Sequence, residues 1–305
     1  MKKAALSFLG MLLISAGTLF SEEDFNGLEI WYSAGYNDGD VTFQESQPGF
    51  TRSKVEFEAK GVHYLGGGFR YQFVNSDLPR LSMSLDGFVG RSYDGTTKDS
   101  DWLVSSNNVM IYSESDEEAE QNAYDFNFGW KMLDKANGFE KLDFLIGYFQ
   151  DSYDFEVNNV NTQIWNYNSI NSVVLGHASN FETRLRGYYF GLDNSLTFFN
   201  NKLRVNASVK YIPNLRGEGD GEWELRDLEF NQEGNGDGYK AALGVTVKPF
   251  EGWTFGLKVT KTDLEVDGHV DNTYMDATWY DLGVTDLDYI KAEGVDTQLL
   301  IGYRF

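Results

Sequence analysis

The C-terminal segment, residues 295–305, constrains the fold of this chain more than any other part of its sequence. Its side chains alternate, with apolar residues such as Leu299 and Tyr303 on one side and polar residues such as Arg304 on the other. Successive side chains of a β-strand point to opposite faces, so the segment predicts a strand with one apolar and one polar face. The chain stops on an aromatic residue, Phe305.

A closing strand of this kind resembles the last strand of bacterial outer-membrane β-barrels, and the N-terminus agrees with export. Lys2 and Lys3 precede an apolar stretch at residues 4–13, and small residues follow. This pattern predicts a secretory signal peptide over residues 1–21, which leaves residues 22–305 as one barrel domain. The apolar stretch is too short to anchor the chain as a membrane-spanning helix. The chain has no cysteine, so core packing or a closed sheet must hold it together.

The charge balance limits the partners that this chain can bind. The net charge is −22, and removal of Lys2 and Lys3 with the signal peptide takes away two positive charges and gives −24. Phosphate binding needs clustered Lys and Arg, so we expect no nucleic-acid partner, and no motif indicates a cofactor. Cationic peptides or divalent ions are the partners that the charge favours. The alternative is that acidic loops only keep a cell surface hydrated.

Alternating segments recur along the whole chain, and turn residues separate them. They predict an all-β fold, a ten-stranded antiparallel transmembrane β-barrel. A bulge or kink is expected at Gly61 or in the glycine run at residues 66–68. The predicted strands cover residues 25–36, 53–73, 80–91, 123–133, 141–157, 181–198, 203–211, 238–248, 253–266 and 294–305.

The connections between these segments alternate between short and long. This is the pattern of short periplasmic turns and long extracellular loops in a barrel of the outer membrane, where we expect a monomer. A barrel of about ten strands is too narrow to be a general porin, so activity should lie on the long loops. The predicted long loops are residues 37–52, 92–122, 158–180, 215–237 and 267–293.

Carboxylates crowd those loops. Asp99 and Asp101 are two residues apart, so in an extended segment they point the same way. Two close carboxylates repel, and one then holds a proton near neutral pH, which suits acid–base work on a water molecule. The same pair can chelate a cation or simply be solvated.

Several stretches resemble the omptin family of outer-membrane endopeptidases. They include KDSDWLVSSNN, FETRLRGYYFGLDNSLTFFNNKLRVNASVKY and GVDTQLLIGYRF, and the resemblance runs over about residues 53–305. It implies a ten-stranded barrel with an outward-facing active site, an Asp pair on the second long loop and an Asp–His dyad on the fourth. In that family the two pairs hold a water that attacks a peptide bond, commonly next to basic residues.

One half of that site matches this chain and the other half does not. Asp99 and Asp101, followed by Trp102, match the family's Asp-x-Asp-Trp. On the fourth loop Asp220 or Glu222 can take the acidic place. The candidate catalytic residues are therefore Asp99, Asp101, Asp220 and Glu222.

The histidine of the dyad is missing, because Trp223 stands about where it belongs. Imidazole can take a proton from water near pH 7 and indole cannot. Two of the chain's three histidines, His177 and His269, lie on predicted loops and could lean over the groove, whereas His63 does not. Alternatively, the four carboxylates act alone under mildly acid conditions, or they bind a divalent cation.

Three functions remain open from the sequence. The first is an outer-membrane surface barrel with an acidic groove and an incomplete protease site, which binds cationic peptides, extracellular or host proteins, and lipopolysaccharide. The second is an active aspartic-type endopeptidase that cleaves near basic residues, and the third is a structural or ion-binding barrel. The candidate substrate-binding residues are Asp38, Asp40, Trp102 and Trp223, and no metal ligand set is assigned.

Overall fold

The computed structural model describes residues 27–47, 50–73, 81–102, 111–134, 141–164, 170–199, 202–224, 228–274 and 284–305. These residues form twelve β-strands and no α-helix. In this part of the chain no helix is long and apolar enough to cross a membrane. The predicted signal peptide, residues 1–21, lies outside the described residues.

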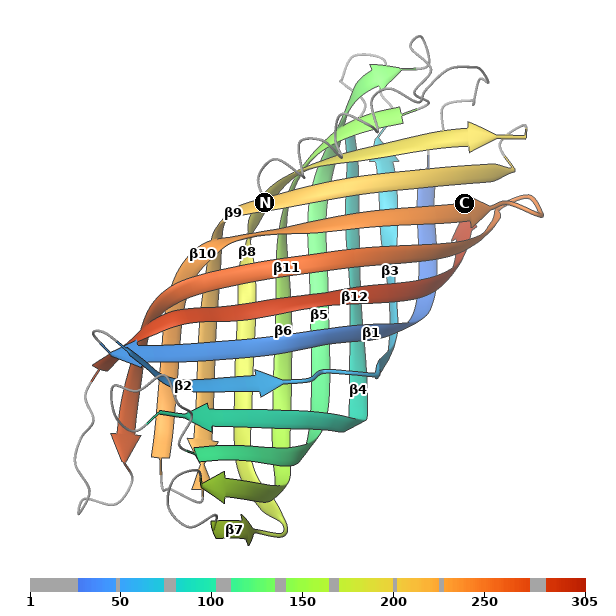
Figure 1. Ribbon diagram of the computed structural model, residues 1–305. Helices are drawn as coiled ribbons and strands as arrows, with labels where there is room; N and C mark the ends of the chain where they lie inside the picture. The colour runs from blue at the N-terminus through green and yellow to red at the C-terminus, as the bar shows by residue number, and fades with distance from the viewer. Residues whose placement is uncertain are drawn as a thin grey trace.

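Strands that pair with each other run antiparallel, up and down the molecule (Figure 1). Their bounds are β1 Gly27–Gln47, β2 Phe50–Phe57, β3 Val62–Phe73, β4 Leu81–Asp101, β5 Ile111–Asp134, β6 Lys141–Ile164, β7 Ile170–Val173, β8 His177–Phe198, β9 Leu203–Trp223, β10 Leu228–Val247, β11 Trp253–Tyr274 and β12 Val284–Arg304.

The sheet closes on itself through its first and last strands. β1 pairs antiparallel with β12 from Glu29 opposite Arg304 to Ser46 opposite Asp286. The other long strands each pair with two neighbours, which completes the ring (Figure 1). This closed antiparallel sheet confirms the predicted barrel class.

The structure has two strands more than the ten predicted. The single strand expected over residues 53–73 is divided into β2 and β3 by a bend at residues 58–61, where Gly61 has a φ of 75°. A kink near Gly61 was expected, because glycine adopts positive φ without steric cost. The other addition is the four-residue strand β7, which pairs with the upper part of β6.

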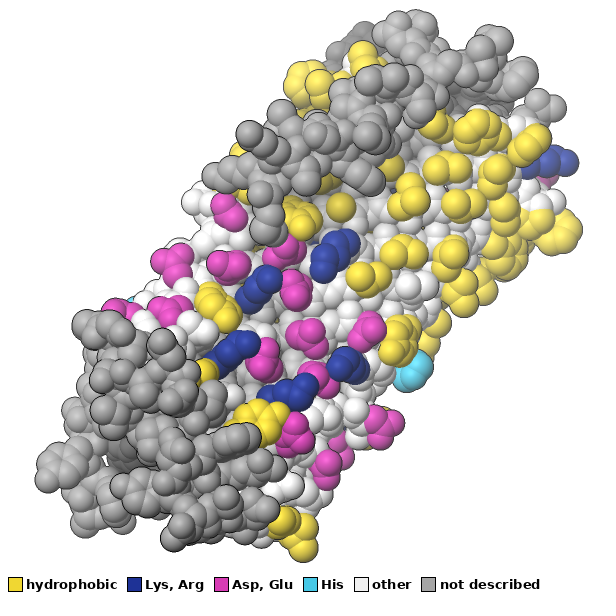
Figure 2. All heavy atoms as spheres, viewed as in Figure 1, with side chains coloured by type: hydrophobic (Ala, Val, Ile, Leu, Met, Phe, Trp, Pro, Cys, Tyr) yellow, Lys and Arg dark blue, Asp and Glu magenta, His cyan; other side chains and the backbone are white. Residues whose placement is uncertain are grey.

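The two ends of the barrel differ in chemistry, and we name them by their residues. The turn end carries Gly27 and Phe305, and the mouth is the opposite end, which carries Gln47 and Trp223. Side chains near the turn end are apolar on the outside of the barrel, and Figure 2 shows them over one half of the visible face. This band suits a lipid environment. Its exposed members include Tyr32, Leu65, Val89, Trp130, Ile146, Tyr188, Leu243, Leu257, Leu299 and Ile301.

The polarity of the wall is reversed in the half nearer the mouth. There the outer face carries Lys, Arg, Asp and Glu (Figure 2), and the apolar side chains point inward. Along β12, for example, Leu299 and Ile301 are exposed, whereas Leu287 and Ile290 are fully buried. Each long strand therefore passes from a lipid-facing pattern to the pattern of a water-soluble barrel with an apolar core.

This reversal explains why the predicted bounds of the long loops are wrong. Residues 37–47, 92–101 and 215–223, all assigned to loops, belong to β1, β4 and β9. Their alternation persists, but the apolar side has moved from the outer face to the lumen. The strands are predicted from apolar residues that face lipid. That pattern ends where each strand leaves the apolar band, so the prediction assigns the rest of the strand to a loop.

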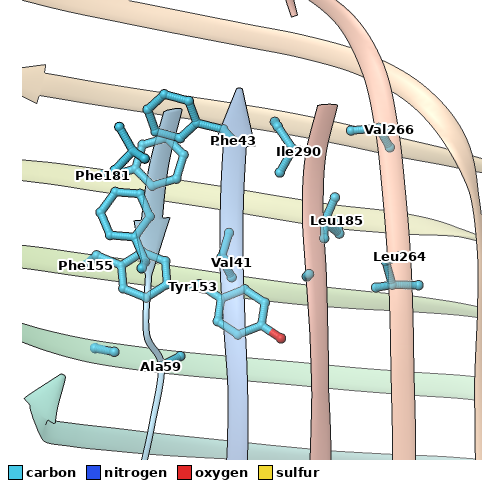
Figure 3. Packing of buried hydrophobic residues seen from close by; sticks show 14 of the residues in the cluster. Val41, Phe43, Ala59, Tyr153, Phe155, Phe181, Leu185, Leu264, Val266 and Ile290 are labelled. Atoms are coloured by element: carbon cyan, nitrogen blue, oxygen red, sulfur yellow. The ribbon is translucent and has the colours of Figure 1, made fainter. Parts of the chain in front are cut away.

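Five phenylalanines fill the lumen in the mouth half, and we term them the aromatic plug: Phe43, Phe57, Phe155, Phe181 and Phe230. They come from β1, β2, β6, β8 and β10, so they meet across the barrel (Figure 3 shows Phe43, Phe155 and Phe181). The ring centroids of Phe57 and Phe181 are 4.8 Å apart and those of Phe57 and Phe155 are 4.5 Å apart. Close-packed rings at this level leave no wide aqueous path through the barrel.

Between the plug and the turn end the lumen is polar and crossed by ion pairs. Lys210 lies 2.5 Å from Asp125, and Lys240 lies 2.6 Å from Asp151. A cavity of about 110 Å³ lies among these side chains. These inward charged groups are paired, as charges shielded from bulk water must be.

Replacement of Phe57 by Ala should destabilise the barrel by about 3–5 kcal/mol, because the ring is almost fully buried between Phe155 and Phe181 and its removal leaves a cavity. Urea unfolding in lipid vesicles measures the change. Phe250→Ala is the control, since that ring is exposed in the turn after β10 and its loss should cost under about 0.5 kcal/mol. Equal losses for the two variants would contradict the plug's role.

Candidate functional site

Two carboxylates of the predicted site line the lumen at the mouth. Asp99 and Asp101 lie on the inward face of β4, opposite Val55 and Ser53 of β2, and each is less than a tenth exposed. Val55 belongs to the buried core, which fixes the direction of its neighbour Asp99. The pair therefore lies just above the aromatic plug, on the mouth side.

A third carboxylate, Glu45 of β1, lies in the same row. Ser53 of β2 is opposite Glu45 on one side and Asp101 on the other, so the three side chains form a row across three neighbouring strands. The hydroxyl of Thr285 donates to Glu45 at 3.3 Å, and the amide of Asn272 donates to that hydroxyl at 3.2 Å. The site thus contains an acid that sequence reasoning missed.

The environment of Glu45 favours its protonated form. Burial raises the pKa of Glu45, and the negative charge of Asp101 adds to the rise. The positive charge of Arg52 and the hydrogen bonds from Thr285 and Asn272 lower the pKa and offset part of this effect. A cationic ligand that replaced the lost hydration would favour the ionised form instead.

The wall opposite the aspartates is formed by β8 and β9. Phe57 of β2 stacks on Phe181 of β8, so these strands face each other across the lumen. Asp99 is opposite the β2 residue that lies one inward position from Phe57 toward the mouth. Trp223 is opposite the β8 residue that lies one inward position from Phe181 toward the mouth. The indole of Trp223 and the carboxylate of Asp99 therefore belong to facing walls at one level.

Asp220 and Glu222 point away from this site. Asp220 is exposed, and in the strand ladder it is opposite Glu182 of β8. Glu182 is next to the buried Phe181, so its side chain lies on the outer face. Burial raises the pKa of Asp220, and the charges of Glu182 and Glu218 raise it further. The structure does not bring Asp220 and Glu222 together with the mouth aspartates, so the predicted four-carboxylate groove is corrected to the three inward acids.

The inward positions of β9 leading to the mouth are glycines. Gly217, Gly219 and Gly221 precede Trp223 on the lumen side. A Cβ on Gly221 would lie 2.1 Å from the ring of Phe230, a distance that real side chains do not tolerate. The Phe230 ring thus fills the space into which an acidic side chain two residues before Trp223 would project.

The structure describes all three histidines of the chain, and none faces the lumen. His177 lies on the outer rim, 3.6 Å from a carboxylate oxygen of Glu156 and 3.6 Å from one of Glu224. His269 and His63 are exposed on the outer faces of β11 and β3. Among the described residues no group of three or more His, Cys, Asp or Glu could hold a metal ion. No imidazole is therefore placed to take a proton from a water held by Asp99 and Asp101.

The candidate substrate-binding residues are divided between two places. Trp102 follows β4 at the mouth, and its backbone N–H donates to the carbonyl of Arg52 at 2.8 Å. Asp38 and Asp40 lie on the outer face of β1 rather than on a loop, and Asp38 is exposed. Trp102 and Trp223 thus border the mouth, whereas the two aspartates do not.

Glu117 of β5 is a further buried acid that sequence reasoning missed. Its carboxylate is 1% exposed, and the Thr97 hydroxyl donates to it at 2.7 Å. Burial raises the pKa of Glu117 to about 7, the Thr97 hydrogen bond lowers it, and the charge of Glu58 raises it. Thr97 lies two residues before Asp99 on the inward face of β4, so Glu117 supports the strand that carries the mouth aspartates.

Comparison with known proteins gives a family and a fold. A family model described as the Omptin family matches residues 32–249. The crystal structure of the outer membrane protease OmpT from Escherichia coli superposes with a TM-score of 0.79 at 16% sequence identity, covering 95% of this chain and 100% of that chain.

Other comparisons are weaker. The outer membrane protein OprG from Pseudomonas aeruginosa aligns at 10% identity over 92% of this chain and 96% of that chain, with a TM-score of only 0.40. A search among curated proteins finds no match.

Stability should fall with rising pH through the titration of Glu117. The pKa of this group is about 7 in the folded chain and 4.5 ordinarily, so between these values the unfolded chain loses the proton while the folded chain keeps it. Glu117→Gln removes this loss and should be more stable than the parent by about 3 kcal/mol at about pH 8, with little difference at about pH 4.

Urea unfolding at the two pH values provides the measurement. Glu229→Gln, at an exposed position of β10, is the matched control and should show no such pH dependence. A constant difference between Glu117→Gln and the parent across this range would rule out the titration.

Proposed function

We propose that this chain, which belongs to the omptin family, is a non-proteolytic surface barrel that binds cationic peptides or proteins at its mouth. Its fold and family are those of a bacterial outer-membrane protein. In this proposal the mouth faces the outside of the cell and the turn end faces the periplasm. The closed barrel acts as a monomer.

One observation supports the loss of proteolysis above all others: among the described residues, the inward positions of β8 and β9 opposite Asp99 carry no imidazole and no carboxylate. The resemblance to the family calls for an Asp–His dyad there, and the inward positions hold Gly221 and Trp223 instead. Phe230 occupies the space beside Gly221, so the missing carboxylate is replaced by a packed ring. A water held by Asp99 and Asp101 would have no imidazole partner to activate it.

The retained acids support binding of a cation. Glu45, Asp99 and Asp101 are each less than a tenth exposed, so their charges are poorly screened by solvent. Below them the buried rings of the aromatic plug exclude water, which strengthens charge interactions at the acids. A net charge of −22 over the whole chain steers positively charged partners toward the barrel. An arginine or lysine side chain matches all three features.

Lipopolysaccharide is the second partner in this proposal. On the outer face, just beyond the exposed ring of Tyr188, three guanidinium groups surround Glu218. Arg186 lies 2.5 Å, Arg216 3.2 Å and Arg184 3.8 Å from its carboxylate oxygens. Arg184 also lies 2.7 Å from Glu182, so three arginines meet two acids and leave one positive charge at the edge of the apolar band, where lipid phosphates lie.

Peptides that contain Arg-Arg or Lys-Lys should bind the lipid-refolded barrel without being cleaved, between about pH 5 and about pH 8. Affinity should fall as salt rises, because the interaction is between charges. The combined variant Glu45→Gln, Asp99→Asn and Asp101→Asn should weaken binding about tenfold or more. Calorimetry measures the binding, and mass spectrometry of the recovered peptide reports cleavage.

Asp267→Asn is the control, because it removes one charge from an exposed position of β11 far from the lumen. It should leave the affinity within about twofold of the parent. Cleavage that Asp99→Ala abolishes would replace the binding proposal with an active endopeptidase. Absence of both binding and cleavage would leave a structural barrel.

Trp223→His alone should not create a protease, because Gly221 supplies no carboxylate to orient the new imidazole. A variant that combines Trp223→His, Gly221→Asp and Phe230→Ala should cleave Arg-Arg peptides at a detectable rate, since the last change opens the space that the aspartate needs. A fluorogenic dibasic peptide provides the assay. Cleavage by Trp223→His alone would show that the imidazole needs no carboxylate at position 221.

A further inference from the structure

The short strand β7 stands outside the closed ring of the barrel. Its four residues pair with β6 from Asn161 opposite Val173 to Ile164 opposite Ile170. Among the described strands β6 is its only partner, so the second edge of β7 carries no strand. A strand edge with unpaired N–H and C=O groups is a template for pairing with another chain.

A backbone hydrogen bond next to β7 shows toward which edge the N–H and C=O groups of each β7 residue point. The N–H of Val174 donates to the carbonyl of Val160 at 2.8 Å. In an antiparallel pair, hydrogen-bonded and non-hydrogen-bonded residues alternate, so the backbone groups of Ser172 point toward β6. Those of Val173 and Asn171 point to the other edge. A partner strand would meet the backbone groups of these two residues.

Hydrogen bonds hold the C-terminal end of β7 to the barrel. The N–H of Asn159 donates to the carbonyl of Gly176 at 2.9 Å, and the N–H of Gly176 donates to the side chain of Asn159 at 3.0 Å. Both residues have positive φ, 54° and 96°; Asn159 lies within β6 and Gly176 lies between β7 and β8, where the partner of β6 changes from β7 to β8. The edge is therefore held in place before any partner arrives, which lowers the entropic cost of binding.

The surroundings of β7 are acidic throughout. The neighbouring stretches 111–118, 154–164 and 219–224 contain no Lys or Arg, and residues 170–176 contain no charged residue at all. The side chains of Val173 and Leu175 are 62% and 80% exposed. Apart from the inward Glu117, the acids of the three stretches are Glu114, Asp116, Glu118, Asp154, Glu156, Asp220, Glu222 and Glu224.

We propose that β7 is the docking edge for the cationic partner, which pairs with it as an extended strand containing Lys or Arg. The partner's backbone bonds Val173 and Asn171, its basic side chains meet Glu156 and Glu224, and its apolar side chains cover Val173. This inference rests on the proposed function and adds the binding mode. A second copy of this chain is a poor occupant, because the acidic stretches that flank β7 in the two copies would repel each other.

A peptide of alternating Lys and Val tests the strand addition, with the full mature barrel in lipid nanodiscs. The parent peptide should bind in low salt. The same peptide with every second backbone nitrogen methylated keeps its charge but cannot pair along one edge, and it should bind about tenfold more weakly or not at all. Val173→Pro removes the outward N–H of β7 without touching a β6 bond and should weaken the parent peptide to a similar extent.

Val173→Thr is the matched control, since it keeps the backbone N–H and the β-branched shape, and it should bind like the parent. Equal affinity for the methylated peptide, or full affinity in Val173→Pro, overturns docking at β7 while cationic binding at the mouth stands. No binding of the parent peptide at any salt concentration overturns the proposed function together with this inference. A dimer of the barrel that Val173→Pro dissolves overturns it in favour of self-pairing.

Discussion

Main-chain pairing of β1 with β12 is the interaction on which the rest of the structure depends. In lipid no water can satisfy an open strand edge, so a membrane-spanning sheet must close. The pairing extends from Glu29–Arg304 near the turn end to Ser46–Asp286 near the mouth, and thus closes both halves of the barrel with one ladder. Closure divides every side chain between an outside and a lumen, and the chemistry of the molecule follows from that division.

The outside and the lumen have opposite polarities in the two halves of the barrel. Around the apolar band the outside is apolar and the lumen holds paired charges such as Lys210 and Asp125. Toward the mouth the outside is charged, and the aromatic plug makes a dry core like that of a soluble barrel. The mouth acids lie next to this core, where Glu45 and Asp99 are partly cut off from water, so the cationic ligand that we propose would interact strongly with them. Where the family resemblance implies a catalytic wall, this chain has Phe230 packed against Gly221.

The sequence was sufficient to predict the barrel class, the family and the strand segments of the apolar band, because alternation against lipid is a local signal. The same rule failed above the band, where the apolar face changes sides and the strands were interpreted as loops. Asp99 and Asp101 share a face whatever the length of β4. Asp220 and Trp223 are an odd number of residues apart, so once β9 is known to reach Trp223 they must lie on opposite faces. Glu45 lies an even number of residues from Phe43 and was detectable by the same parity. Glu117 left no such signal, because its burial depends on the neighbouring strands.

The reversal of polarity also fixes how far the molecule reaches from the bilayer. A vertical shift either way would move charged side chains into hydrocarbon or Leu and Tyr into water, so the barrel has one stable depth. On β1 the change falls near Tyr36, and the strand continues to Gln47. At the usual rise and tilt of barrel strands this length lifts the mouth roughly 25–30 Å from the membrane surface. Because the raised half has a close-packed core, it holds the mouth rigidly above the bilayer. A partner too bulky to approach the headgroups can still contact the mouth.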